Sequence, residues 1–124
     1  MKSIKYNKLI RDKIPEIIEK SGKEAIIDVL DDHTFKKYLD GKLSEELKEY
    51  LASDSMEELA DLIEVVYAIL KHKKVSLTDF EEIRMQKVME RGAFDKRLRL
   101  KEVNDNTFRD ITEGKKGYSF VGID

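Results

Sequence analysis

Two short acidic segments carry the residue types best suited to chemistry in this chain. They read EELKE at residues 45–49 and EELAD at residues 57–61. Each segment contains two acids spaced three residues apart, and residues at positions i and i+3 share one face of a helix. The spacing therefore predicts two pairs of carboxylates, each pointing one way. The pairs are Glu46 with Glu49 and Glu58 with Asp61.

The stretch between these segments has the composition of a tight turn. It reads ASDS at residues 52–55, and these residue types favour turns and helix N-caps. In an antiparallel helical hairpin, residues equidistant from the turn lie at about the same height. Counted from the middle of the turn, the acids form two equidistant pairs, Glu49 with Glu58 and Glu46 with Asp61. We therefore expect four carboxylates to converge at two adjacent levels.

Four carboxylates without a neighbouring thiolate or imidazole form a hard, oxygen-only site. Such donors favour Mg²⁺ or Mn²⁺ over zinc or copper. The chain contains no cysteine, and neither His33 nor His72 has a glutamate three residues before it, as a di-iron bundle requires. Magnesium held by a few carboxylates usually also binds substrate phosphates. The expected cofactor is therefore Mg²⁺ or Mn²⁺, and the expected substrate carries phosphate groups.

Basic side chains elsewhere in the chain are candidates for binding phosphate oxygens. Each is equally well explained by the general abundance of Lys and Arg on surfaces and at helix ends. There is no glycine-rich phosphate loop, so a P-loop mechanism is not expected. The candidates are Lys8, Arg11, Lys87, Arg91, Lys96 and Arg97.

The same acids also have a purely structural interpretation. Ser55 and Glu58 have the spacing of a capping box, and acids in a first helical turn are stabilised by the helix dipole. Glu46 and Glu49 can equally be solvated. An alternative of another class is therefore a non-catalytic helical interaction module, in which an apolar face of residues 56–72 binds a partner helix.

Hydrophobic periodicity predicts the helices that would position the acids. Residues 56–70 are apolar around most of the helix circumference, which is typical of a buried helix. Residues 33–52 carry a narrower apolar stripe, and shorter helices are expected at 14–21 and 78–91. We expect an all-α fold with a helical hairpin core, flanking helices, and short extended segments near 24–30 and after 93. The apolar stripe of the first hairpin helix consists of Leu39, Leu43, Leu47, Tyr50 and Leu51, and a Thr78–Glu81 capping box begins the last helix.

Length and composition limit the remaining possibilities. The 124 residues suit one domain, with 101–124 as a C-terminal extension that includes a loop or short hairpin at 113–124. A net charge of −2 gives no support for nucleic-acid binding. No segment is long and apolar enough to cross a membrane. Because the chain lacks cysteine and a start typical of a signal peptide, we expect a cytoplasmic protein.

The acidic segments resemble a known signature. EELKE followed by EELAD is similar to the Glu-Glu-x-x-Glu and Glu-x-x-Asp motifs of the MazG-like all-α nucleoside triphosphate pyrophosphohydrolases. This superfamily includes the dimeric dUTPases and phosphoribosyl-ATP pyrophosphohydrolase. YNKLIRDKIPEII at 6–18 and ERGAFDKRL at 90–98 resemble a small single-domain group within it, whose expected task is the removal of noncanonical nucleotides.

The resemblance implies an activity and a set of site residues. Members cleave between the α- and β-phosphates with Mg²⁺, releasing a nucleoside monophosphate and pyrophosphate. Their hairpins pair, which implies a homodimer completing a four-helix bundle. Phosphoribosyl-ATP hydrolysis in histidine synthesis is an alternative within the same superfamily. The connection at residues 50–57 is short for the superfamily, where longer connections help to shape the base pocket. The implied metal ligands are Glu46, Glu49, Glu58 and Asp61, and the implied catalytic residues are Glu45, Glu46 and Glu49, with Glu45 orienting water or a second metal.

Overall fold

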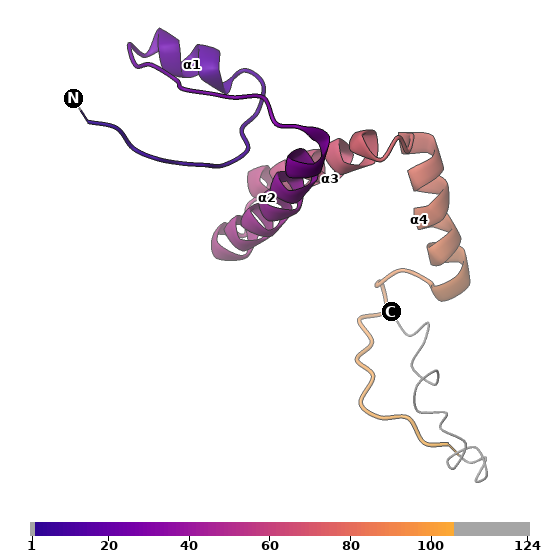
Figure 1. Ribbon diagram of the computed structural model, residues 1–124. Coiled ribbons are helices and arrows are strands. Elements are labelled where there is room, and N and C mark those ends of the chain that lie inside the picture. The colour runs from indigo at the N-terminus through magenta and orange to yellow at the C-terminus, as the bar shows by residue number, and fades with distance from the viewer. Residues whose placement is uncertain (1, 106–124) are drawn as a thin grey trace. The chain divides into compact units, whose positions relative to one another are not determined.

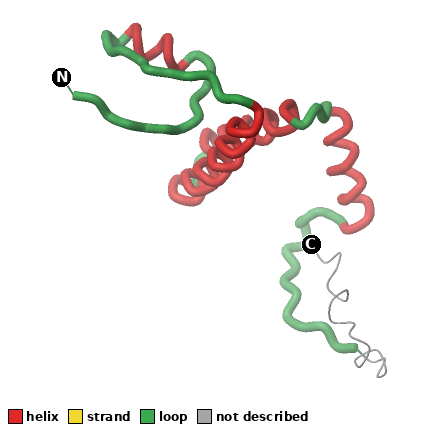
Figure 2. Tube along the Cα trace, in the orientation of Figure 1, coloured by secondary structure: helices red, strands yellow, loops and turns green. Residues whose placement is uncertain are grey.

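The computed structural model describes residues 2–105, and this part of the chain is helical with no strand (Figure 2). The expected all-α class is thus confirmed for the described residues. The loop or short hairpin expected at 113–124, and most of the expected C-terminal extension, fall outside them. The helices are α1 (Ile14–Lys20), α2 (Asp32–Ser53), α3 (Met56–His72) and α4 (Leu77–Arg91) (Figure 1).

The hairpin formed by α2 and α3 is the centre of the fold, and the two helices pack against each other. Asp54 closes α2 in the left-handed conformation (φ 55°), and its N–H donates to the carbonyl of Tyr50 at 2.7 Å. The Ser55 hydroxyl accepts a hydrogen bond from the Glu58 N–H at 3.2 Å and begins α3. The predicted turn at 52–55 and its N-cap are therefore confirmed.

The buried apolar residues of the described chain belong to the two hairpin helices. They are Leu39 of α2, with 1% of its surface exposed, and Val65 and Leu70 of α3, with 8% and 7% exposed. The stripe predicted for the first helix is wrong at two positions, because Leu47 and Leu51 are 45% and 70% exposed. At roughly 100° per residue these two lie about 80° and 120° round the helix from Leu39, away from α3.

Over residues 56–67, helix α3 is covered on one side only. Val65 faces α2, whereas the opposite side presents a stripe of exposed apolar side chains. A single hairpin is expected to leave one apolar face of this helix uncovered, and the exposed side chains agree with that expectation. The residues that define the exposed α3 stripe are Met56, Ile63 and Tyr67, with 70%, 43% and 44% of their surface exposed.

Helices α1 and α4 begin with different residue types. Pro15 lies in the first turn of α1, and Gly22 follows its end with φ at +89°, as the sequence predicts. The capping box predicted at Thr78 is wrong. The Ser76 hydroxyl caps α4 by accepting from the Asp79 N–H at 3.0 Å. Glu81, which was to complete that box, forms an ion pair with Arg84 instead.

The segments expected to be extended contain no strand in the described residues. Residues 23–31 have no regular secondary structure. The run after Ala93 begins with a turn, in which the Arg97 N–H donates to the Phe94 carbonyl at 3.2 Å. The described helices include none with the length and apolarity needed to cross a membrane. By internal contacts the chain divides into two units, residues 1–90 and 91–124, so the hairpin and the N-terminal segment belong to one unit.

Candidate metal centre

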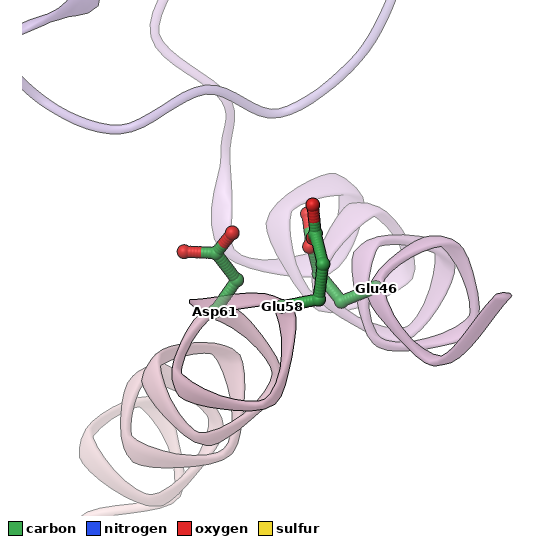
Figure 3. Close-up of side chains that lie close together, drawn as sticks. All are labelled: Glu46, Glu58 and Asp61. Atoms are coloured by element: carbon green, nitrogen blue, oxygen red, sulfur yellow. The ribbon is translucent and has the colours of Figure 1, made fainter. Parts of the chain in front are cut away.

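Three carboxylates from the two hairpin helices lie close together (Figure 3). Glu46 comes from α2, and Glu58 and Asp61 come from the beginning of α3. One oxygen of each lies within 4.8 Å of the others. Opposite ligands of Mg²⁺ are about 4.2 Å apart when each metal–oxygen bond is about 2.1 Å. Small side-chain rotations are therefore enough to place all three oxygens around one ion.

Two of the carboxylate oxygens in this group are buried without a partner. Glu46 is only 5% exposed, and its Oε2 accepts no hydrogen bond. The Oε2 of Glu58 is likewise buried and unpartnered. Buried polar atoms without a partner are uncommon in folded proteins, because desolvation of the group is then not compensated. A cation is the kind of ligand that would satisfy both oxygens at once.

The electrostatics of Glu46 show that this position disfavours uncompensated charge. Burial is the main cause that raises the pKa of Glu46 above the ordinary glutamate value, and the neighbouring Glu49 carboxyl raises it further. The Lys42 ammonium lowers the pKa of Glu46, but its effect is smaller than the combined effect of burial and Glu49. A divalent ion would supply the missing positive charge.

Glu49 lies beside the group of three and is not part of it. Its side chain is exposed, and its carboxyl acts on the site by helping to raise the pKa of Glu46. The predicted convergence of four acids is thus found for Glu46, Glu58 and Asp61, with Glu49 next to Glu46. That Glu49 joins the ligands when a metal is present stays a prediction.

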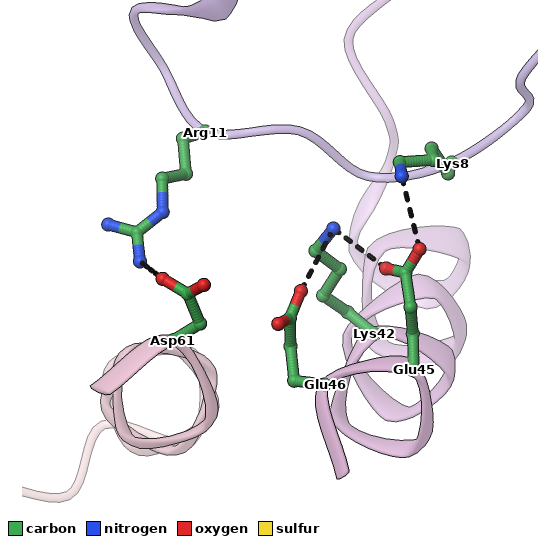
Figure 4. Close-up of polar contacts among 6 residues, drawn as sticks. All are labelled: Lys8, Arg11, Lys42, Glu45, Glu46 and Asp61. Atoms are coloured by element: carbon green, nitrogen blue, oxygen red, sulfur yellow. Dashed lines mark hydrogen bonds and ion pairs between the residues drawn. The ribbon is translucent and has the colours of Figure 1, made fainter. Parts of the chain in front are cut away.

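Three cations are in contact with the acids (Figure 4). Lys8 Nζ lies 3.1 Å from Glu45 Oε1, and Arg11 Nη2 lies 2.7 Å from Asp61 Oδ1. Both residues belong to the segment before α1. Both are among the phosphate-binding candidates predicted from the sequence. Lys42 of α2 bridges Glu45 and Glu46.

Glu45 itself is held by two of these cations. The hydrogen bond from Lys42 is the main cause that lowers the pKa of Glu45 below the ordinary value, and the bond from Lys8 adds to it against the effect of burial. For Lys42, burial works to lower the pKa, but Glu45 and Glu46 outweigh it and raise the pKa above that of an ordinary lysine. Glu45 is therefore an ionised carboxylate beside the three converging acids.

Lys42 was missed by the sequence reasoning. It lies three residues before Glu45 and four before Glu46, which is the spacing of helical ion pairs. This spacing is a signal in the sequence from which the contacts of Lys42 with Glu45 and Glu46 can be predicted.

The four remaining phosphate-binding candidates lie on other elements. Lys87 is exposed on α4, and Arg91 is the last residue of that helix. Lys96 and Arg97 follow in the second unit, with Arg97 in a left-handed conformation (φ 55°). Their role in phosphate binding stays a prediction.

Comparison with known proteins gives little further information. No family model matches the chain, and no solved structure matches it. A stretch of 47 residues is 45% identical to an uncharacterized protein of Mycolicibacterium smegmatis. The stretch covers 38% of this chain and 48% of that protein, so the chain spans about half the length of the relative it matches. The case for a function therefore depends on the geometry of the site and on the resemblance of the motifs.

Proposed function

We propose that this chain is a Mg²⁺-dependent nucleoside triphosphate pyrophosphohydrolase of the MazG-like all-α kind. It would cleave between the α- and β-phosphates and release a nucleoside monophosphate and pyrophosphate. The observation that carries the proposal is the meeting of Glu46, Glu58 and Asp61, with two buried and unpartnered oxygens among them. These three residues occupy motif positions in the two segments that resemble the superfamily signature.

The donor set suits magnesium or manganese. All three converging groups are carboxylates, and among the described residues the group includes no imidazole. Glu46, Glu58 and Asp61 would hold the ion, and Glu49 would join them by a rotation of its exposed side chain. When bound, the ion would neutralise phosphate charge and lower the pKa of an attacking water.

The chain's own residues would bind and orient the reactants around the ion. Glu45 is an ionised carboxylate next to the site, so we assign it the role of orienting the attacking water. Lys8 and Arg11 pair with acids of the site across exposed contacts. Because such pairs are worth only ~0–1 kcal/mol, these cations can exchange a carboxylate for a phosphate oxygen at little cost.

The proposed assembly is a homodimer. The exposed α3 stripe is an apolar surface on the side of the helix opposite α2. Exposed apolar patches on soluble proteins commonly mark association sites. Packing of two hairpins through this stripe would complete a four-helix bundle. A stable monomer at micromolar concentration in sedimentation velocity would contradict this arrangement.

The non-catalytic interaction module would use the same stripe. It predicts that the acids are solvated caps, so Mg²⁺ or Mn²⁺ should leave the melting temperature unchanged. A metal bound only by the native state raises the melting temperature, and the stabilisation grows with the logarithm of its concentration over Kd. Thermal unfolding with and without each ion therefore separates the two functions before any substrate is known.

The direct test is pyrophosphate release from a panel of nucleotides in the presence of Mg²⁺. The panel includes ordinary and noncanonical nucleoside triphosphates and phosphoribosyl-ATP, because the last represents the alternative in histidine synthesis. We expect stoichiometric pyrophosphate and monophosphate from at least one nucleoside triphosphate. Release of inorganic phosphate alone, or no reaction with any substrate, would contradict the proposal.

A further inference from the structure

We infer that Lys42 is a positioning residue of the proposed metal centre: it holds Glu45 outside the ligand set and competes with a metal for Glu46. This inference rests on the proposed function. Lys42 Nζ lies 2.7 Å from Glu45 Oε2 and 3.4 Å from Glu46 Oε1. Its side chain is only 17% exposed, so the ammonium is held among the acids and does not extend into solvent.

The two carboxylates that Lys42 contacts are in different states. Glu45 has both oxygens occupied, with Oε2 on Lys42 and Oε1 on Lys8. Glu46 has one oxygen at the longer distance from Lys42 and the other buried with no partner. An incoming ion can therefore reach Glu46 without breaking a short contact. To recruit Glu45, the same ion would have to remove two cations.

This difference assigns separate roles to adjacent glutamates on one helix. Glu46 is available as a ligand, whereas Glu45 is kept ionised and restrained beside the ligands, as a group that orients water must be. Lys42 produces both effects from one position. It would also place a positive charge near an ion held by Glu46, and like charges repel each other in a partly buried site.

Removal of the Lys42 charge should therefore have opposite effects on binding and on turnover. Metal affinity should increase, because the competing cation is gone and only Lys8 still holds Glu45 away from the ion. Turnover at saturating metal should decrease, because Glu45 has lost the shorter of the two contacts that hold it in place. A residue with a purely structural role would not tighten metal binding when it is replaced.

The experiment measures Mn²⁺ affinity and pyrophosphate release for Lys42→Met, Lys42→Gln and Lys42→Arg in the full chain. For both neutral variants we expect Kd for Mn²⁺ to fall by about three- to tenfold, the size expected for removal of one partly screened like charge. We expect kcat at saturating Mn²⁺ to fall by at least about tenfold, as for loss of a positioned acid–base group. Lys42→Arg should restore the affinity to that of wild type, because the charge remains.

Lys36→Met is the matched control, because Lys36 is a lysine of the same helix that pairs with Asp40 and not with the site. It should leave both measurements unchanged. Unchanged or weaker Mn²⁺ binding in both neutral variants would overturn the inference, and so would an unchanged kcat. The use of two neutral variants allows a result even if one of them fails to fold. If wild type itself binds no Mn²⁺, the proposed function fails, which is a separate outcome.

Discussion

Arg11 Nη2 lies 2.7 Å from Asp61 Oδ1, although the two residues are 50 positions apart in the sequence. The contact brings the segment before α1 to the acids at the beginning of α3. Lys8 makes a second contact of the same kind with Glu45, so this segment meets the site at two points. In the proposed function both cations would bind phosphate oxygens of the substrate.

Replacement of Arg11 should therefore affect substrate binding more than folding. The Arg11 side chain is 58% exposed, so Arg11→Gln should reduce the free energy of unfolding by less than ~1 kcal/mol. We expect KM for the nucleotide to rise by about tenfold or more, in line with loss of a charge-assisted hydrogen bond. Lys13→Gln, which replaces another basic residue of the same segment, is the control and should keep the wild-type KM. Equal KM values for the two variants would remove Arg11 from the phosphate site.

Amide replacement of the four proposed metal ligands should abolish the proposed activity while the fold remains. Each change removes one charge with little change of shape, so pyrophosphate release should fall by at least about a hundredfold. The variants are Glu46→Gln, Glu49→Gln, Glu58→Gln and Asp61→Asn. Glu57→Gln and Glu64→Gln are the controls, because these exposed acids of α3 are outside the converging group.

Pyrophosphate release from the same nucleotide mixture with Mg²⁺ compares all six variants directly. Glu58→Gln and Glu57→Gln form the sharpest pair, since they differ by one position on the same helix. Equal activity in these two variants would contradict both the proposed metal centre and the proposed enzymatic activity. Glu49→Gln has an additional use: wild-type activity in that variant would mean that Glu49 stays beside the site and does not bind the ion.

The hairpin and most of its site could be predicted from sequence because the signals are local. The turn at 52–55 and the Ser55 cap depend on neighbouring residues, and the i,i+3 spacing fixes the direction of Glu58 and Asp61. Local signals can also compete. The sequence predicts that α4 begins at Thr78, but the cap is Ser76, two residues earlier.

Other features depend on tertiary contacts that local patterns do not specify. Sequence spacing places Glu46 and Glu49 on one side of α2, but only the packing against α3 buries the first and leaves the second exposed. The contacts of Lys8 and Arg11 join residues 37 and 50 positions apart, and no periodicity encodes such pairs.

The raised pKa of Glu46 predicts a pH dependence of stability in the absence of metal. An acid whose pKa is higher in the folded than in the unfolded state takes up its proton first in the folded state. The free energy of unfolding should therefore increase as pH falls from above the raised pKa toward the ordinary value of 4.5. Glu45 and Glu81 have lowered pKa values and act oppositely, with stability lost only as pH falls below 4.5.

Urea unfolding in EDTA between pH 4.5 and 7.5 tests this prediction. Glu46→Gln should flatten the slope in this window, and Glu57→Gln should retain it. The stabilisation by Mn²⁺ should show the reverse trend and grow with pH, because the ion binds the ionised carboxylates. A wild-type stability that is independent of pH over this range, or a slope that survives in Glu46→Gln, would show that Glu46 is not the group responsible.

Dimerisation through the exposed α3 stripe should be sensitive to one charge placed within it. Ile63 is 43% exposed in the isolated chain, and in the proposed bundle it would be buried against a second copy. Ile63→Glu should therefore convert the dimer to a monomer at micromolar concentration, because an unpaired carboxylate at a buried interface costs several kcal/mol. Sedimentation velocity measures this directly. Glu64→Lys changes the charge at the next residue, on the polar side of α3, and should leave the dimer intact. Monomers in both variants, or a dimer in Ile63→Glu, would place the interface elsewhere on the chain.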